Sequence, residues 1–193
     1  MERRSECINK KQKDRKERIS MNKQEIAIET IKMDGADLTK RCILVTSGTF
    51  EEGKFNTMTV NWGFFGTMWY DPSVLLVIRP SRYTFEYIER CHNFTLTILP
   101  EKYKEVYTLM GSKSGRDSDK VKESGLTPIR SMKVESPSFE EACYTMECEA
   151  TYIGDLQAEG ILVSGIMKRD YPNGDFHKMI IGKIVNAWKT EEF

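Results

Sequence analysis

The sequence has few cysteines and histidines, and it lacks any long hydrophobic run. It contains 5 cysteines, none of them in a Cys-x-x-Cys pair, and 2 histidines, so neither a disulfide framework nor a structural zinc site is predicted. The longest apolar run covers residues 73–78, whereas a membrane span needs about 20 apolar residues. The charged N-terminus has no apolar segment typical of a signal peptide. We therefore expect a cytoplasmic protein with no bound metal and no membrane partner.

Several common nucleotide and hydrolase motifs are also absent. The chain contains no Gly-x-Gly-x-x-Gly, no Gly-x-x-x-x-Gly-Lys-Ser/Thr and no Gly-x-Ser-x-Gly. These absences argue against a dinucleotide-binding Rossmann domain, a P-loop ATPase and a serine hydrolase. They leave open a nucleotide ligand on another fold.

The charge of the chain is balanced but unevenly distributed. Lys+Arg and Asp+Glu both total 29, and residues 1–20 alone carry 8 basic and 4 acidic side chains, which leaves the rest mildly acidic. Nonspecific affinity for nucleic acids comes from neutralised phosphates, so no nucleic-acid partner is expected. The length of 193 residues suits one domain with a sizeable core. We predict a charged flexible tail over residues 1–21 and one domain over residues 22–193, with regular structure beginning near Ala36.

Five segments carry the pattern of β-strands, in which β-branched and aromatic residues are common and apolar and polar residues alternate. The first two cover residues 42–46 and 55–62, and they are expected to pair through a loop over residues 47–54. The others cover residues 74–78, 94–99 and 144–152.

A last pair of strands is predicted over residues 161–170 and 176–185. The segment between them contains Pro172-Asn173-Gly174, and Asn-Gly supplies the positive φ angles that a tight hairpin turn needs. The two segments should therefore form a hairpin.

Short helices are predicted over residues 84–90, 103–110 and 117–123, with Gly111 and Gly125 as stop signals for the last two. Six or seven strands with small helices between them indicate a mainly β fold with short α insertions. The sequence thus predicts a β-barrel with α excursions.

The densest cluster of hydroxyl and cationic residues runs from Arg79 to Thr84, between a predicted strand and a predicted helix. Ser81 or Thr84 is expected as the N-cap, and the first turn of a helix leaves backbone N–H groups unpaired. Together with the guanidinium groups of Arg79 and Arg82, these groups would form an anion pocket suited to a phosphate. An ordinary capped helix with surface arginines would use the same residues, so both interpretations stay open.

Two further segments and one histidine also carry two interpretations each. Residues 111–120 combine small residues, hydroxyls and cations, which suit either a phosphate-wrapping loop or a solvated one. Residues 56–63 alternate polar side chains with Met58 and Trp62, which suits a flat aromatic ligand or a half-exposed barrel strand. His177 lies on the last predicted strand. Its unshifted pKa of about 6.5 would suit proton transfer, although a lone histidine is more often structural.

Taken in order along the chain, these segments resemble the flavin reductase-like family, and within it the flavoredoxin-type branch. The resemblance extends from about Ala36 to Val185. It implies an FMN-binding split β-barrel of Greek-key-like topology that works as a homodimer, with FMN near the subunit interface. The motifs that carry it are Asn56-x-Met58-Thr59-x-x-Trp62, Arg79-Pro80-Ser81-Arg82-Tyr83-Thr84, Ser114-Gly115-Arg116-Asp117-x-Asp119-Lys120 and His177-x-x-x-x-Gly182.

The resemblance also implies roles for individual residues. One set would line the isoalloxazine, a second would hold the phosphate and ribityl chain, and a third would close over the phosphate. His177 would be the catalytic residue near the flavin and the nicotinamide. The three sets are Asn56, Thr57, Met58, Thr59 and Trp62; Arg79, Ser81, Arg82, Tyr83 and Thr84; and Ser114, Arg116 and Lys120.

The leading hypothesis is a flavin-dependent oxidoreductase that takes electrons from NAD(P)H through bound FMN to free flavin or another acceptor. An alternative is a noncatalytic FMN-binding electron carrier reduced by a redox partner protein, because the same pocket residues would serve it. A third interpretation, a small barrel that binds no flavin and acts as an interaction module, also stays open.

Overall fold

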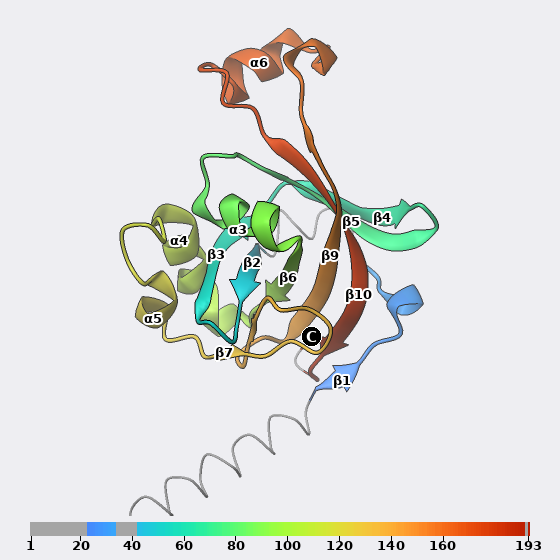
Figure 1. Cartoon of the computed structure of the whole chain (residues 1–193), viewed down its shortest axis with the longest axis vertical. Helices are drawn as coiled ribbons and strands as arrows, with labels where there is room; N and C mark the ends of the chain where they lie inside the picture. Colours follow the sequence, from blue (N-terminus) through green and yellow to red (C-terminus); the bar gives the residue numbers. More distant parts are fainter. Residues whose placement is uncertain (1–22, 34–41, 192) are drawn as a thin grey trace, which may run out of the picture.

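A single large antiparallel sheet dominates the computed structural model, which describes residues 23–33, 42–191 and 193 (Figure 1). Its strands follow the order β3-β2-β6-β9-β10-β5-β4, and β1 adds to β10. A separate pair, β7 and β8, lies beside it. The predicted mainly β fold with short helices is confirmed. The strands are β1 Gln24–Glu25, β2 Ile43–Thr49, β3 Lys54–Val60, β4 Gly63–Met68, β5 Asp71–Ile78, β6 Asn93–Ile98, β7 Pro128–Ile129, β8 Ser138–Phe139, β9 Tyr144–Asp155 and β10 Lys178–Lys189.

The two ends of the sheet order are strands that follow one another in the chain. β3 and β4 are joined only by Asn61 and Trp62, yet in the described part of the chain they do not pair with each other. The carbonyl of Trp62 instead accepts a hydrogen bond from the Val77 N–H at 3.3 Å. The barrel is therefore split between β3 and β4, and no strand among the described residues covers the outer edge of β3.

β9 and β10 are the longest strands, with twelve residues each, and their pairing curves the sheet. The register between them shifts at Ile181/Gly182 and again at Ile184/Asn186, and such bulges bend a strand and increase its twist. A Cβ on Gly182 would lie 2.4 Å from the Phe94 ring. Glycine at this bulge lets β10 approach the core closely.

The main core fills the concave side of the sheet and is built by the alternation of apolar residues on each strand. Large side chains from β2, β5, β6, β9 and β10 are fully buried there. A smaller apolar cluster, which includes Leu44, Tyr107, Met110 and Phe139, lies under α4 (Lys104–Ser112). Main-core members include Val45, Leu76, Phe94, Met146 and Ile180.

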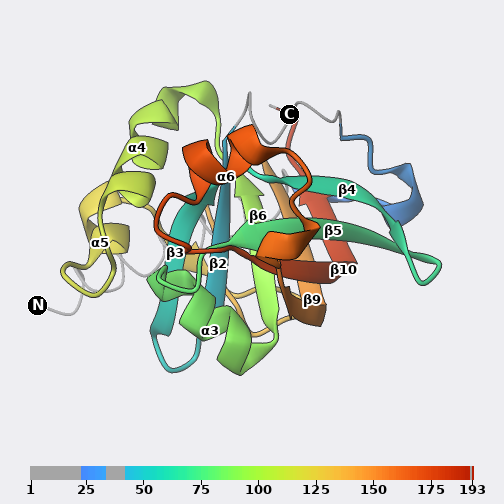
Figure 2. The same cartoon turned by 90° about the horizontal axis from the view of Figure 1, so that it is seen from above.

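Short helices occupy the connections around the barrel. α3 (Tyr83–Cys91) packs against β2 and β3, and α4 packs along β3. In Figure 2, α4 and α5 lie on one side of the barrel and the β4 strand on the other, while α6 lies on the segment that projects from the top of Figure 1. None of the described helices is long and apolar enough to cross a membrane. The remaining helices are η1 Ile28–Thr30, α3 Tyr83–Cys91, η2 Glu101–Tyr103, α5 Lys120–Ser124, η3 Ala158–Gly160 and α6 Ser164–Asp170.

A buried carboxylate fixes the loop after β7. Glu147 on β9 is fully buried and accepts hydrogen bonds from the backbone N–H groups of Met132 and Lys133, and from Asn186 Nδ2 at 3.0 Å. Burying a charge is costly unless hydrogen bonds satisfy it. This carboxylate therefore holds the loop against the sheet.

The predicted hairpin of residues 161–170 and 176–185 is wrong. Residues 164–170 form α6, and β10 pairs with β9 and β5 instead. Gly174 has a positive φ of 69°, but Asn173 does not, so the Asn-Gly pair makes no two-residue hairpin turn. The apolar residues that suggested a strand lie on the projecting segment, where Leu162 and Val163 are exposed.

A hairpin that the sequence did not predict is formed by β4 and β5. Its turn residues are Trp69 and Tyr70, with φ angles of 51° and 68°. Bulky residues rarely adopt this left-handed conformation, which Asn and Gly favour. The turn signal is therefore missing from the sequence.

Several element boundaries differ from those predicted. The loop between the first two strands is shorter than residues 47–54, because β2 continues to Thr49. Gly111 does not stop α4, which ends at Ser112. α5 begins at Lys120 rather than 117, with Asp119 as its N-cap and Gly125 as its left-handed terminus. The predicted tail over residues 1–21 lies outside the described residues. The predicted start of regular structure near Ala36 is wrong, because β1 already pairs with β10 and η1 covers Ile28–Thr30.

Candidate functional site

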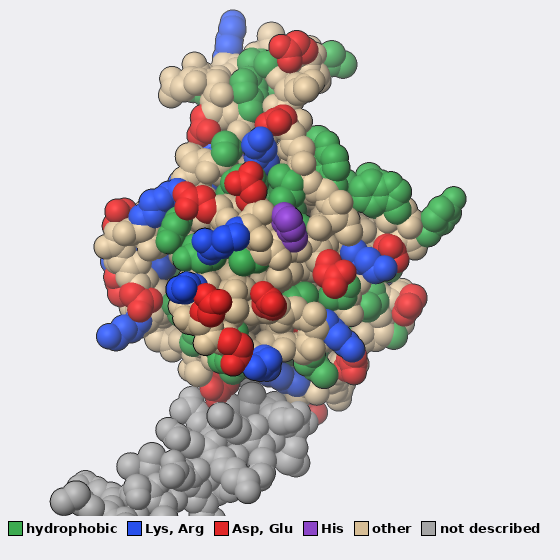
Figure 3. Space-filling view, in the orientation of Figure 1, with side chains coloured by type: hydrophobic (Ala, Val, Ile, Leu, Met, Phe, Trp, Pro, Cys, Tyr) green, Lys and Arg blue, Asp and Glu red, His purple; other side chains and the backbone are tan. Residues whose placement is uncertain are grey.

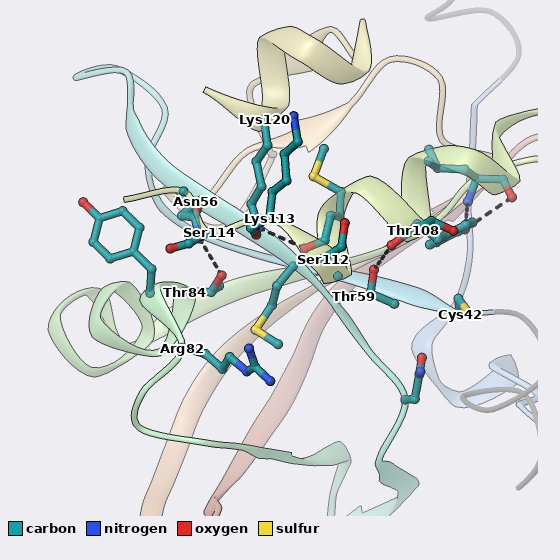
Figure 4. Close-up of a pocket in the computed structure, with 18 of the residues that line it drawn as sticks. Cys42, Asn56, Thr59, Arg82, Thr84, Thr108, Ser112, Lys113, Ser114 and Lys120 are labelled. Atoms are coloured by element: carbon teal, nitrogen blue, oxygen red, sulfur yellow. Dashed lines mark hydrogen bonds between the residues drawn. The ribbon is translucent and has the colours of Figure 1, made fainter. Parts of the chain in front are cut away.

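A cavity of about 890 Å³ lies along β3, between the start of α3 and helix α4 (Figure 4). Figure 4 shows Asn56, Thr84 and Ser114 together at one end, and Cys42 at the other end beyond Thr59. The lining is contributed by β3, by the turn before α3, by α4 and by the segment that follows α4. It includes Asn56, Met58, Thr59, Asn61, Ser81, Arg82, Tyr83, Thr84, Lys104, Tyr107, Thr108, Gly111, Ser112, Lys113, Ser114, Gly115, Arg116 and Lys120.

The N-terminus of α3 lies at one end of this cavity. Arg82 occupies the N-cap position without a side-chain capping bond, so neither Ser81 nor Thr84 is the N-cap that we predicted. The Thr84 hydroxyl is buried and accepts a hydrogen bond of 2.8 Å from Asn56 Nδ2. The positive end of the helix and the unpaired N–H groups of its first turn therefore lie beside a fixed hydroxyl.

Lys120 brings a buried ammonium to the same end. Its Nζ donates hydrogen bonds of 3.0 Å to the carbonyl oxygens of Met110 and Lys113, at the C-terminal end of α4. Burial, and then the nearby charge of Arg82, lower the pKa of Lys120 to about 8. The ammonium is thus held in place by helix carbonyls and is still protonated at pH 7.

Arg116 closes the rim of the cavity over α3. Its guanidinium donates to the carbonyl of Ser81 at 3.1 Å, pairs with Glu86 and lies over the Tyr83 ring at 4.8 Å from the centroid. Its backbone N–H donates to the Ser114 hydroxyl at 3.2 Å. The segment after α4 is therefore tied to the start of α3.

The outer edge of β3 and the side of α4 form the long wall of the cavity. An edge strand leaves alternate N–H and C=O groups without a partner strand. The Thr59 hydroxyl donates to the Tyr107 carbonyl at 2.7 Å and holds α4 against β3. Burial raises the pKa of Tyr107 to about 12, so this hydroxyl stays protonated and accepts from the Leu99 N–H at 2.7 Å.

Trp62 and His177 form a second cluster, outside the lining of the cavity. Their ring centroids lie 4.9 Å apart, and His177 Nδ1 is 2.9 Å from the Tyr171 hydroxyl. Burial, and then the charge of Arg79, lower the pKa of His177 below its ordinary value of 6.5. The imidazole is therefore neutral at pH 7.

Arg79 and Ser81 are engaged by the segment that carries α6. Arg79 donates to the Asp175 carboxylate at 3.1 Å and to the Asp170 carbonyl at 2.7 Å, and the Ser81 hydroxyl donates to Asp175 at 3.3 Å. A carboxylate thus lies where the sequence suggested a phosphate. Arg79 points to this carboxylate and not into the cavity lining.

The structure brings most of the predicted site residues together. Thr57 lies apart because its side chain is fully buried and bonded to Thr46 and to the Val45 carbonyl; Trp62, Arg79 and His177 form the neighbouring cluster. Sequence reasoning assigned no site role to residues 104–110 of α4, several of which line the cavity. The predicted residues that line the cavity are Asn56, Met58, Thr59, Ser81, Arg82, Tyr83, Thr84, Ser114, Arg116 and Lys120.

Comparisons with known protein families and sequences give consistent results. The model of the flavin reductase like domain matches residues 36–192. An uncharacterised protein of Pyrococcus abyssi is 29% identical over 138 residues, which cover 70% of this chain and 76% of that protein.

Solved structures share the fold at low sequence identity. Flavoredoxin of Desulfovibrio vulgaris (Miyazaki F) superposes with a TM-score of 0.61 at 22% identity, covering 78% of this chain and 69% of its own. An FMN-binding domain of a flavin reductases-like enzyme from Shewanella baltica gives a TM-score of 0.63 at 16% identity, with 88% and 78% covered. The split-barrel architecture is therefore confirmed.

The contact between Gly115 and Asn56 should be indispensable for the shape of the cavity. A Cβ on Gly115 would lie 2.0 Å from Asn56 Oδ1. We expect Gly115→Ala to displace Asn56 or the segment after α4 and to lower the free energy of unfolding by about 1–3 kcal/mol. Urea denaturation measures this. Gly165→Ala in α6, where a Cβ meets open space, is the control; equal stability of both variants would contradict the prediction.

Proposed function

Because the chain belongs to the flavin reductase-like family, we propose that it binds FMN in the cavity along β3. We further propose that it transfers electrons from NAD(P)H through FMN to free flavin or another acceptor. The observation that carries the proposal is the end of the cavity where a buried ammonium, a fixed hydroxyl and a helix N-terminus lie together. These are the groups that bind a phosphate.

The phosphate end fits a dianion by charge and by geometry. Lys120 is held by two carbonyl groups and keeps one N–H for a ligand. Arg82 and Ser114 line the same end of the cavity, and the first turn of α3 adds backbone donors. The phosphate of FMN would lie between α3 and the segment after α4.

The long wall of the cavity fits a flat ring with a polar edge. The edge of β3 presents backbone donors and acceptors, and Met58 offers an adaptable apolar surface. Bound FMN would supply the hydride and electron chemistry, and this chain would supply its orientation. In this arrangement Thr57 contributes its backbone only, since its side chain is buried in the sheet.

We assign the Trp62–His177 cluster to the donor or acceptor rather than to the FMN phosphate. The neutral His177 ring is oriented by Tyr171, so it could take up a proton near a reacting flavin. Arg79 lies over the Tyr171 ring, 5.7 Å from its centroid, and is paired with Asp175. The structural similarity to a flavoredoxin also supports a second candidate function, that of a noncatalytic FMN-binding carrier reduced by a redox partner protein.

The visible absorption spectrum of the protein with FMN, before and after anaerobic addition of NADH or NADPH, tests this proposal. We expect a perturbed flavin spectrum that bleaches with one of the two nucleotides. Binding without bleaching would favour the carrier. No binding of FMN would contradict both candidates.

The lowered pKa of Lys120 should make FMN binding weaken at alkaline pH. With a pKa of about 8, the ammonium is protonated at pH 7 and mostly neutral above pH 9, while the phosphate remains a dianion. If the phosphate raises that pKa by one unit in the complex, affinity falls about tenfold across this range. Fluorescence titrations at pH 7 and 9.5 measure it. Riboflavin, which lacks the phosphate, is the control, and parallel losses for both flavins would contradict the prediction.

We also propose that the protein is a homodimer that uses the β4–β5 hairpin and the segment carrying α6. Figure 3 shows hydrophobic side chains along the hairpin that extends from the barrel. Phe64 is 72% exposed and Tyr70 is completely exposed, and Leu162 on the α6 segment is 92% exposed. Large apolar side chains exposed on projecting segments are typical of interfaces.

Replacing the strained turn of the hairpin should separate the dimer without unfolding the protomer. In the double variant Trp69→Asn/Tyr70→Gly, the turn gains residues that favour positive φ, while two aromatic side chains are lost. We expect dimer dissociation at concentrations about tenfold higher than for the wild type, by analytical ultracentrifugation, since aromatic residues commonly dominate interfaces. A dimer of unchanged affinity would exclude the turn of the hairpin from the interface.

A further inference from the structure

The segment after α4, residues 113–117, lies between the cavity along β3 and a second cavity of about 650 Å³. Its residues Gly115 and Arg116 line both cavities. The wall is closed at Gly115, because a Cβ there would lie 2.0 Å from Asn56 Oδ1 and 3.2 Å from the Tyr83 ring. The segment therefore separates the end of the first cavity that is proposed for the phosphate from the second cavity.

The guanidinium of Arg116 is directed at α3 and at the turn before it. Its Nη1 donates to the Ser81 carbonyl at 3.1 Å, its Nη2 pairs with Glu86, and the group lies over the Tyr83 ring, 4.8 Å from the centroid. A planar, forked guanidinium can make all three contacts at once. They hold the middle of the segment against α3.

Arg82 differs from Arg116 although both line the same cavity. The Arg82 guanidinium forms no hydrogen bond or ion pair within the described part of the chain. It is therefore available to an anion that enters the cavity. Arg116 would have to leave a carbonyl, a carboxylate and a ring to bind the same anion.

The start of the segment is held from α5. Lys113 pairs with Glu123, and the Lys113 carbonyl accepts from Lys120 Nζ at 3.0 Å. A turn follows, in which the Asp117 N–H donates to the Ser114 carbonyl at 3.2 Å. The start of the segment is thus fixed to α5, and the contacts of Arg116 fix the turn that follows it to α3.

We propose that Arg116 is a positioning residue and not a phosphate ligand: together with Glu86 it forms a latch that holds residues 113–117 closed over the phosphate end of the cavity. This inference rests on the proposed function, because the latch acts on a flavin whose phosphate lies inside the segment. Opening of the segment would join the two cavities at that end, and flavin would enter and leave during such openings.

The exposure of the latch determines how firmly it closes. The side chains of Arg116 and Glu86 are 42% and 50% exposed, and ion pairs of this exposure are weak. The segment therefore opens often, and the flavin exchanges with free flavin rather than staying permanently bound. The latch sets the rate of this exchange.

Amide hydrogen exchange of the full chain measures the latch directly, because exchange reports local opening. In Glu86→Gln and in Arg116→Lys, we expect residues 113–117 to exchange about threefold faster, which is the range that an exposed ion pair allows. Glu51→Gln is the matched control, since it removes the partner of the exposed Arg130 outside both cavities. Unchanged exchange in the two latch variants would overturn the proposal.

The kinetics of flavin binding by Arg116→Lys separate a latch from a phosphate ligand. The substitution keeps the positive charge but loses the planar fork that reaches several partners. In stopped-flow fluorescence, we expect the association and release rates of FMN both to rise about threefold, with Kd within twofold of the wild type. Riboflavin, which lacks the phosphate, should respond in the same way. A change in Kd for FMN alone would make Arg116 a phosphate ligand and overturn the proposal.

Two other outcomes are equally decisive. Faster exchange of the segment with unchanged flavin kinetics would mean that flavin leaves by another side of the cavity, which would overturn the latch and leave the proposed function intact. No binding of FMN by the wild-type protein would overturn the proposed function itself. Thermal unfolding of each variant verifies that it folds.

Discussion

The unpaired outer edge of β3 is the constraint on which the site depends. A fully closed barrel would satisfy this edge with β4, and no cavity would remain between the sheet and α4. The short connection through Asn61 and Trp62 instead carries the chain from one end of the sheet order to the other. The carbonyl of Trp62 bonds to β5, which directs β4 away from β3. The same short connection thus opens the barrel and positions one ring of the second cluster.

The cation at the end of the cavity proposed for the phosphate is held in place by the fold itself. Lys120 neutralises the negative end of the α4 dipole through the carbonyl groups of Met110 and Lys113. Substituting it would therefore disturb both α4 and the cavity, so a simple loss of binding in such a variant would have two causes. The hydrogen bond between Asn56 and Thr84 similarly links β3 to α3. Groups that face the cavity also hold its walls together, which reduces the ordering needed on binding.

The strands with regular alternation could be predicted from sequence, and the elements without a local signal could not. The pattern over residues 144–152 identified β9 because half of its residues face the core. β4 was not predicted because Trp69 and Tyr70 occupy the turn in place of the usual turn residues. α6 was predicted as a strand because the exposed apolar residues before it have the pattern of a buried strand. The motifs indicated which segments lie at the cavity, but they did not indicate the direction of each side chain. Thr57 points into the sheet while its neighbours Asn56 and Met58 line the cavity, which is the two-residue period of a strand.

The segment that carries α6 is inserted between two strands that are already paired at its root, where Lys178 lies opposite Asp155. Loop-closure entropy rises only slowly with length, so such an insertion can lengthen, shorten or change composition while the register of the barrel persists. It is anchored by the hydrogen bonds that Arg79 and Ser81 donate to Asp170 and Asp175, and by the contact of the Tyr171 hydroxyl with His177 Nδ1. Evolution could therefore change the surface that this segment presents to other molecules while the cavity along β3 stays the same.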